Sequence, residues 1–271
     1  MVDTKILLRI AKEDNFSLAD TLNCGQCFRW DEAEDGSFEG VVEGVFCRAR
    51  QTAEGIAVDS DGSEQFWGNY FDIATSYAAV REQLCTDATL AQAAAFAPGI
   101  RVLRQYPWET LCSFIISQNN NIKRIRGIVT RLCESFGEKL PCGKYSFPAA
   151  EQLAGLSIDE LAPLRSGFRA KYIIDAANKV ASGEVNLDDV AKQPLEEARK
   201  TLQTISGVGP KVAECALLYG FGRMECFPLD VWMKRAMKEL FPAGLPQCAN
   251  EYAGIAQQYI FNYARLSGKI L

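Results

Sequence analysis

The chain of 271 residues contains no histidine. This absence excludes the Ser-His and Cys-His nucleophile arrangements, the histidine-containing zinc sites and the commonest general base at neutral pH. Any catalysis by this chain must therefore use lysine, aspartate, glutamate, cysteine or tyrosine side chains.

Long apolar runs and arrayed cysteines are absent too. No apolar run reaches the length of about 18 residues that spans a bilayer, and Arg9 interrupts the short apolar stretch near the amino terminus. We expect neither a membrane span nor a secretory signal, and an intracellular location. The ten cysteines are scattered, which indicates buried thiols rather than a disulfide framework. Cys24 and Cys27 have CxxC spacing, but no second pair completes a zinc site, so we expect no bound metal.

Basic residues are fewer than acidic ones, which gives the chain a net charge of -5 and an isoelectric point of about 5.1. Taken over the whole chain, this balance argues against nucleic-acid binding. The charge is uneven, however. Residues 31–65 carry ten acidic residues against two arginines, whereas residues 101–139 carry seven basic residues against three glutamates. A local basic face is therefore expected despite the acidic total.

The pattern of apolar residues divides the chain into a sheet part and a helical part. From Phe16 to about Asp61, short apolar runs alternate with glycine and acidic turns, as in an antiparallel sheet. Apolar residues then recur at helical spacing from about residue 122, and further helix signals lie at Ser157, at 169–180 and at 194–205. We expect an α+β fold with an amino-terminal antiparallel sheet domain at 1–100 and a helical domain at 101–271. The amino-terminal segment can also contribute to the helical core.

A helix-hairpin-helix is predicted at about residues 194–220. Two helices meet at Gly207-Val208-Gly209, and Pro210 opens the second helix. The glycines permit a tight turn, and amides exposed at the start of a helix suit an anion such as a DNA phosphate. A glycine turn alone is also a common structural corner between helices, so the surrounding residues must decide.

Lys211 lies in the first turn of that second helix, and Asp230 follows nineteen residues later. The positive end of the helix dipole and desolvation favour a neutral, nucleophilic amine at Lys211. Asp230 is placed to cap the next helix and to face Lys211 across a cleft. A surface lysine and a capping aspartate without chemistry are the alternative interpretation of the same pair.

Several segments together resemble the 8-oxoguanine DNA glycosylase family, in its bifunctional glycosylase/lyase branch. They are LNCGQCFRW, LRQYPWETLCSFIISQNNNIKRI, SGFRAKYI, GVGPKVAEC with FPLDVWM, and AQQYIF, and they cover most of residues 16–261. The asparagine triplet before a basic helix, combined with the lysine and the aspartate, makes the resemblance specific. It implies an amino-terminal antiparallel sheet domain and two helical subdomains with a lesion pocket between them.

The resemblance assigns the chemistry to Lys211 and Asp230. It implies that the damaged nucleotide is flipped out of double-stranded DNA, because C1′ cannot be attacked inside the stack. Lys211 would attack C1′, expel the base and form a Schiff base that permits β-elimination. Asp230 would stabilise the positive charge that develops on the sugar. Such a mechanism needs no histidine.

The resemblance also assigns contacts with the flipped base. The carbonyl of Gly25 would accept a hydrogen bond from N7–H, which 8-oxoguanine has and guanine lacks. Cys215 and Phe261 would sandwich the base, and Gln257 would read its Watson-Crick edge. Core packing is the alternative for Cys215 and Phe261.

On the DNA side, Asn119 would fill the gap left by the extruded base, and Phe168 would wedge beside the opposite base. Arg124 and Arg169 would hydrogen-bond the estranged cytosine, which implies a preference for cytosine over adenine. The glycines of the hairpin, Gly207 and Gly209, would approach a phosphate.

The chain departs from the family pattern at three places. Trp232 stands where histidine is usual near the lesion's phosphate, and Phe168 stands where tyrosine is usual. Cys24 and Cys27 flank Gly25 where serines are usual. None of these positions is the lysine or the aspartate, so the departures concern fine specificity and not the reaction class.

No cofactor is expected, apart from a monovalent or divalent cation that the helix-hairpin-helix could hold. The endonuclease-III-like glycosylases carry four cysteines after the aspartate for an iron-sulfur cluster, and only Cys248 follows Asp230 here. We expect a monomer that acts on 8-oxoguanine in double-stranded DNA, in the cytoplasm and nucleoid of a prokaryote. The alternative function is a non-catalytic helix-hairpin-helix module that binds DNA. The presence of both Lys211 and Asp230 argues against it.

Overall fold

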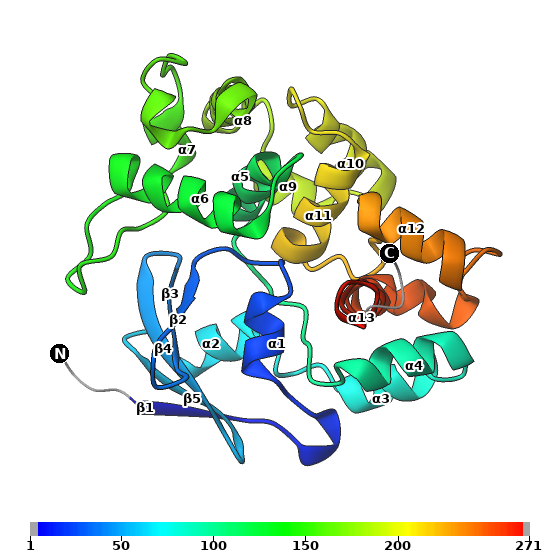
Figure 1. Ribbon diagram of the computed structural model, residues 1–271. Helices are drawn as coiled ribbons and strands as arrows, with labels where there is room; N and C mark the ends of the chain where they lie inside the picture. Colours follow the sequence, from blue (N-terminus) through cyan, green and yellow to red (C-terminus); the bar gives the residue numbers. More distant parts are fainter. Residues whose placement is uncertain (1–4, 268–271) are drawn as a thin grey trace.

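The computed structural model describes residues 5–267 (Figure 1). Five strands form one antiparallel sheet in the order β1-β5-β4-β3-β2. The turn between β3 and β4 has positive φ at both Glu43 and Gly44, the combination that matches the twist of a tight hairpin. This sheet, together with the helices described below, confirms the expected α+β class. The strands are β1 (Lys5–Arg9), β2 (Trp30–Glu32), β3 (Phe38–Val42), β4 (Val45–Thr52) and β5 (Gly55–Ser60).

Strand β1 lies outside the segment in which strands were expected. It pairs with β5 at the edge of the sheet, where Ile6 is opposite Val58 and Leu8 is opposite Ile56. Ile6 and Leu8 are buried in the core of the sheet domain. A short strand whose partner lies far along the chain has no local signal beyond its apolar residues, which is why it was missed.

Helix α1 (Leu18–Asn23) corrects the expectation of strands from Phe16 onwards. Ser17 caps this helix, because its hydroxyl accepts the N–H of Asp20 at 3.2 Å. Leu18 and Leu22, four residues apart on one face, pack into the core of the sheet domain. The helix ends just before the loop that carries Gly25, so it positions that loop.

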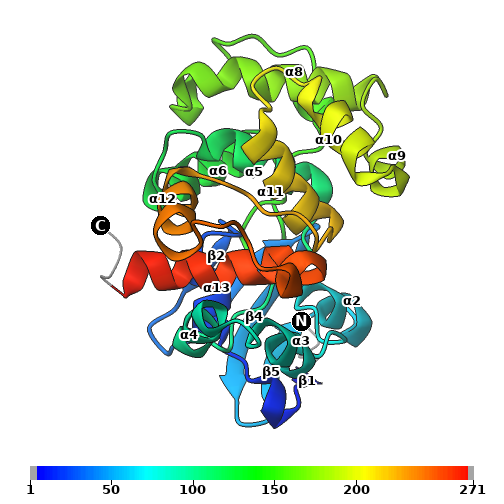
Figure 2. The same ribbon diagram turned by 90° about the vertical axis from the view of Figure 1, so that its right-hand side faces the viewer.

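The rest of the chain is helical and forms two groups (Figures 1 and 2). One group holds α3, α4, α12 and α13, and the other holds α5 to α11. Helix α2 belongs to neither, because it packs against the sheet. α3 and α4 fall within the expected sheet domain of residues 1–100 but pack in the helical core, while the boundary at residue 100 stays a prediction. The helices are α2 (Glu64–Tyr70), α3 (Tyr77–Leu84), α4 (Ala88–Phe96), α5 (Pro107–Ser117), α6 (Ile122–Phe136), α7 (Ala150–Leu153), α8 (Ala170–Ala181), α9 (Leu187–Lys192), α10 (Leu195–Gln203), α11 (Pro210–Phe221), α12 (Val231–Leu240) and α13 (Ala253–Leu266).

The expected helix start at Ser157 is only partly present. Ser157 and Glu160 form the predicted reciprocal capping hydrogen bonds, with 2.8 Å from the N–H of Ser157 to the Glu160 carboxylate. Only a short 3-10 turn, Ala162–Leu164, follows them. Arg165 then adopts a left-handed conformation (φ 54°), which ends the turn. Within residues 5–267, no helix is long and apolar enough to cross a membrane.

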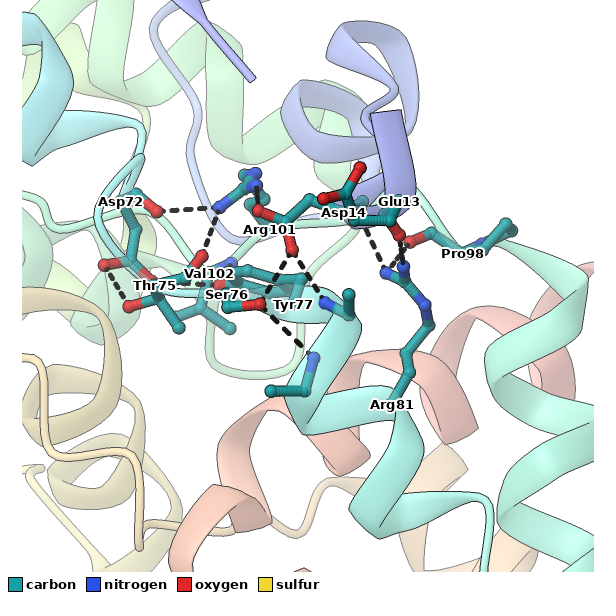
Figure 3. A network of polar contacts seen from close by, with 12 residues as sticks. Glu13, Asp14, Asp72, Thr75, Ser76, Tyr77, Arg81, Pro98, Arg101 and Val102 are labelled. Carbon is teal, nitrogen blue, oxygen red and sulfur yellow. Dashed lines mark hydrogen bonds and ion pairs between the residues drawn. The ribbon is translucent and has the colours of Figure 1, made fainter. Parts of the chain in front are cut away.

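A buried polar network joins the sheet domain to the helical core (Figure 3). Arg101 is fully buried, and its guanidinium donates to the carbonyls of Asp72 at 2.7 Å and Thr75 at 3.2 Å. It also pairs with Asp14 at 3.5 Å and lies 4.3 Å from the centre of the Tyr77 ring. Burial raises the pKa of the Tyr77 hydroxyl, which therefore stays protonated and donates to Asp72. The network holds three chain segments together behind the Gly25 loop.

Candidate active site

A cavity of about 510 Å³ opens where the loop after α1, the α5–α6 loop, α11, the start of α12 and α13 meet. Its walls come from segments that are far apart in the sequence. All the residues expected to touch the flipped base or to do chemistry line it, together with Trp232. They are Gly25, Lys211, Cys215, Asp230, Gln257 and Phe261.

Lys211 is half-buried in the wall of this cavity. Its nitrogen Nζ donates to the hydroxyl of Ser117 at 3.1 Å and lies 5.0 Å from the centre of the Phe114 ring. The Ser117 hydroxyl in turn donates to the carbonyl of Phe114 at 2.8 Å. These two residues of α5 therefore fix the position of the amine.

Asp230 is the N-cap of α12, as the sequence predicted. Its carboxylate accepts the N–H of Met233 at 2.7 Å, and this bond holds one oxygen while the side chain lines the cavity opposite α11. The preceding segment is anchored by Glu214, whose carboxylate accepts the N–H of Phe227 at 2.7 Å. Glu214 itself pairs with Arg199 of α10, so three elements position the aspartate.

Gly25 lies in a left-handed conformation with φ 88°, which favours glycine. Its neighbour Gln26 is almost fully buried and fixes the loop. The Gln26 amide donates to the carbonyls of Thr21 at 2.9 Å and Arg101 at 2.7 Å, and it accepts the N–H of Leu103 at 2.8 Å. These hydrogen bonds hold the loop that carries the Gly25 carbonyl.

The three side chains expected to contact the base, those of Cys215, Gln257 and Phe261, line the cavity, while the contact itself stays a prediction. Cys215 is 3% exposed and lies one turn after Lys211 on α11. Burial, against a smaller opposing effect of the Lys211 charge, raises the pKa of its thiol to about 11, so it is a neutral apolar surface at physiological pH. Phe261 is half-buried at the other side, where the Arg265 guanidinium lies 5.6 Å from its ring centre.

The asparagine triplet divides into three roles. Asn121 caps α6, because its side chain accepts the N–H of Arg124 at 3.0 Å. Asn120 donates back to the carbonyl of Ile116 at 3.1 Å. Asn119 is exposed and left-handed, with φ 46°, so its side chain is displayed at the tip of the loop. Of the three, only the Asn119 side chain makes no hydrogen bond with the described residues, and its role in DNA stays a prediction.

Arg169 is 2% exposed, and the structure places it under the asparagine loop. Its guanidinium donates to the carbonyls of Gln118 and Asn119, the latter at 2.9 Å, and to that of Ser166 at 3.1 Å. Burial, and then the nearby charge of Arg124, lower the pKa of Arg169. Its contact with an opposite cytosine stays a prediction, because these carbonyls occupy most of its donors in the DNA-free protein.

Arg124 and Phe168 lie at the surface beside this loop. Arg124 is exposed and donates to the carbonyl of Arg165 at 3.3 Å. Phe168 is 50% exposed, and the Arg169 guanidinium lies 4.4 Å from its ring centre. An exposed phenylalanine on a short 3-10 turn, Gly167–Arg169, is free to wedge into a stack of bases.

The hairpin has the geometry that its glycines predicted. Gly207 has φ 80°, and a Cβ there would fall 2.4 Å from the Tyr172 ring, so no other residue fits without movement. Gly209 is the exposed N-cap of α11, and a Cβ there would meet open space. The amides at the start of α11 therefore face outward.

Two side chains of helix α8 hold the hairpin by hydrogen bonds. The Asp175 carboxylate accepts the N–H of Ser206 at 2.7 Å, and Lys179 donates to the carbonyl of Thr204 at 2.6 Å. Burial raises the pKa of Asp175, but the hydrogen bond from Ser206 and the contact with Lys179 outweigh it and lower the pKa. A cation at the hairpin stays a prediction. Among the described residues, no group of three or more Cys, Asp or Glu side chains is arranged to hold a metal ion.

A second groove of about 560 Å³ adjoins the cavity and shares Lys211 and Asp230 with it. Asn119 and Gly209 line this groove. Three exposed apolar side chains, those of Leu229, Val231 and Trp232, also line it. Lys211 and Asp230 thus line both the cavity and the groove.

Sequence reasoning missed the residues that support the site. Ser117 and Phe114 hold Lys211, and Gln26 holds Gly25. Tyr219 and Gln258 lie in the cavity wall beside Gln257. Several of these positions fall inside the quoted motif segments, but only the tertiary structure shows what they contact.

Comparisons with known proteins agree with this site. The family model described as 8-oxoguanine DNA glycosylase, N-terminal domain, matches residues 8–111, and that of the HhH-GPD superfamily base excision DNA repair protein matches 112–247. A Saccharomyces cerevisiae protein named N-glycosylase/DNA lyase is 33% identical in an alignment of 252 residues, and the match covers 82% of this chain and 67% of that protein.

Solved structures resemble the whole chain. MBOgg1, in complex with a low affinity DNA ligand, has a TM-score of 0.89 and 42% identity, covering 96% of this chain and 95% of its own. The Clostridium acetobutylicum 8-oxoguanine glycosylase/lyase, in complex with double-stranded DNA containing cytosine opposite to 8-oxoguanine, has a TM-score of 0.87 and 34% identity, covering 94% and 93%. The site and these matches together show that the chain belongs to the 8-oxoguanine DNA glycosylase family of the HhH-GPD superfamily.

Proposed function

We propose that this protein is a bifunctional DNA glycosylase and lyase that flips 8-oxoguanine out of double-stranded DNA and excises it. The observation that carries the proposal is the Lys211 amine, held by Ser117 at 3.1 Å in the wall of a cavity of about 510 Å³ that Asp230 also lines. The named activities of the yeast and Clostridium relatives support it.

The chemistry runs through one amine. Lys211 Nζ bonds to C1′ as the C1′–N9 bond breaks, and the base leaves with the bonding electrons and takes up a proton. Ring opening gives a Schiff base on Nζ, and loss of a C2′ proton then expels the 3′ phosphate by β-elimination. Asp230 lowers the barrier electrostatically, because its charge faces the positive charge that develops on the sugar.

We propose that the enzyme prefers cytosine opposite the lesion. Arg124 is exposed beside the Asn119 tip, and Arg169 retains one N–H beyond the four that bind carbonyls. Both arginines can only donate, so they suit the N3 and O2 acceptors of cytosine. An adenine presents an amine donor at the same edge and would leave a buried donor unpaired.

We propose that the enzyme acts as a monomer without an iron-sulfur cluster, in the cytoplasm and nucleoid. A purified protein that is colourless and elutes as a single chain would fit. An absorbance near 400 nm (about the region of iron-sulfur clusters) that scales with protein would contradict it.

Borohydride trapping tests the mechanism. The wild-type protein should cross-link to DNA containing 8-oxoguanine, since borohydride reduces the Schiff base to a stable amine. Lys211→Gln should not cross-link, because an amide cannot form that intermediate, while it should still bind the DNA. A trapped complex from the glutamine variant would refute the role of Lys211. Binding without any trapping or base release by the wild-type protein would favour the non-catalytic helix-hairpin-helix module instead.

A further inference from the structure

Two neighbouring glutamines of α13, Gln257 and Gln258, both turn into the cavity wall. They are only 5% and 3% exposed, and Tyr219 of α11 lies beside them with 3% exposure. Burying polar groups is costly unless hydrogen bonds replace those to water. Three such groups in the wall of one cavity therefore need a reason.

The three side chains form a closed set of hydrogen bonds around one oxygen. The Gln258 amide nitrogen Nε2 donates to Oε1 of Gln257 at 2.9 Å and to the hydroxyl of Tyr219. That hydroxyl donates to the same Oε1 at 3.4 Å. Both lone pairs of the Gln257 carbonyl oxygen are thereby filled.

The direction of the Gln257 amide is fixed at its other end. Its Nε2 donates to the main-chain carbonyl of Pro228 at 3.4 Å, and this carbonyl can only accept. If the amide of Gln257 turned over, its oxygen would face the carbonyl of Pro228 and its nitrogen would face the amide nitrogen of Gln258. The observed arrangement is therefore the one that the surroundings permit.

Tyr219 is itself rigid. Its ring stacks on Phe114 with centres 5.3 Å apart and an interplanar angle of 16°, and Phe114 also carries the Lys211 amine. Burial keeps the pKa of the Tyr219 hydroxyl well above its usual value, so the hydroxyl remains a donor across the physiological range.

One atom shows that this arrangement is not simple core packing. Oε1 of Gln258 is buried in the cavity wall and finds no hydrogen-bond partner among the described residues. An apolar side chain of similar size would avoid that unpaired oxygen. What the glutamine supplies, and an apolar residue could not, is the amide nitrogen that it directs at Gln257 and Tyr219.

We propose that Tyr219 and Gln258 are positioning residues that hold the Gln257 carboxamide in one orientation and thereby determine which purine edge the cavity accepts. The inference rests on the proposed function. Guanine-type and adenine-type bases carry donors and acceptors in reversed order on the edge that Gln257 reads. Because both lone pairs of its oxygen are filled and one N–H binds Pro228, the fixed Gln257 amide has only its remaining N–H to offer the base. That donor suits the O6 acceptor of a guanine-type base and opposes the N6 amine of an adenine-type base, whereas a freed amide can turn over and suit either.

The test compares two lesions that differ at this edge. Single-turnover excision of 8-oxoguanine and of 8-oxoadenine, each in a duplex, is measured for the wild-type protein, Tyr219→Phe and Gln258→Met. Each variant should shift the ratio of rates toward 8-oxoadenine by about tenfold or more, the size expected for one or two lost buried hydrogen bonds. Because both lesions meet the same protein sample, partial unfolding cancels from the ratio.

Two controls make the result specific. Tyr259→Phe removes a hydroxyl from a tyrosine that is buried on the same helix but does not line the cavity, and it should leave the ratio unchanged. The double variant Tyr219→Phe/Gln258→Met should shift the ratio less than the product of the single shifts, because both act through one amide.

Cleavage of a pre-formed abasic site, where no base enters the cavity, reports on Lys211 separately. Suppose that the wild-type protein cleaves the abasic site and excises 8-oxoguanine, and that both variants show the wild-type ratio of 8-oxoadenine to 8-oxoguanine excision rates. The positioning role is then overturned and the proposed function stands. If the wild-type protein does neither, the proposed function fails and takes this inference with it.

Discussion

Replacing Arg101 by methionine should strongly destabilise the protein. The guanidinium is fully buried and donates to the carbonyls of Asp72 and Thr75 while it pairs with Asp14. Methionine fills similar space but offers no donor, so the two carbonyls lose their partner. Asp14 keeps the bonds from Ser76 and the N–H of Ala78.

The magnitude follows from these contacts. Leaving a buried acceptor unpaired costs about 1 to 3 kcal/mol, and removing one partner of a buried ion pair costs about 3 to 5 kcal/mol. Because Asp14 retains two donors, the two unpaired carbonyls dominate, and we expect a loss of about 2 to 6 kcal/mol in the free energy of unfolding. That is a large part of the roughly 5 to 15 kcal/mol of a typical domain.

Equilibrium unfolding in urea, followed by tryptophan fluorescence, measures the loss. Trp30 and Trp67 are buried in the sheet domain that the network joins to the helices, so their emission reports on its unfolding. Arg48→Met is the matched control, because Arg48 pairs with Asp35 at 3.1 Å on the surface and its loss should hardly move the midpoint. If Arg101→Met moved the midpoint as little as the control, the reasoning about burial would be wrong.

Three further outcomes concern the site. Asp230→Asn should slow base release in single-turnover assays roughly 100-fold, which corresponds to about 3 kcal/mol in the activation free energy. DNA affinity should hardly change, because the charge matters chiefly in the transition state. Unchanged rates would refute the role of Asp230. The wild-type enzyme should excise 8-oxoguanine at least about tenfold faster opposite cytosine than opposite adenine, and Arg124→Met should reduce this ratio of rates. Equal wild-type rates opposite the two bases would mean that the arginines contact only the DNA backbone. Since burial raises the pKa of Cys215 to about 11, its thiolate forms only as the pH rises towards that value. Iodoacetamide at pH 8 should therefore modify the exposed Cys85 and Cys142 and spare Cys215, as peptide mass spectrometry would show.

The sequence predicted those parts of the site that have local causes. Gly207 needs a positive φ, Asp230 caps a helix three residues from its partner amide, and Lys211 follows directly from the hairpin. The sheet of the amino-terminal part and the later helices were likewise visible in their periodicity. Each of these signals is contained within a few neighbouring residues.

Features that depend on distant partners could not be predicted. β1 pairs with β5 across more than forty intervening residues, 10 to 54. The burial of Arg169 beneath the asparagine loop and the set around Gln257 depend on contacts between separate elements. A single sequence has no local pattern for such contacts, because arginine, tyrosine and glutamine also occur at surfaces.

The asparagine loop is already held in one shape in the DNA-free protein. Asn119 has an unfavourable left-handed backbone, and the Arg169 guanidinium beneath it binds the carbonyls of residues 118 and 119. Ordering a flexible loop during association would cost about 1 to 2 kcal/mol of backbone entropy per residue. Here folding has met that cost in advance, so more of the contact energy remains for unstacking the base. We expect the loop to gain little rigidity on binding, and the enzyme to test bases quickly as it moves along a duplex.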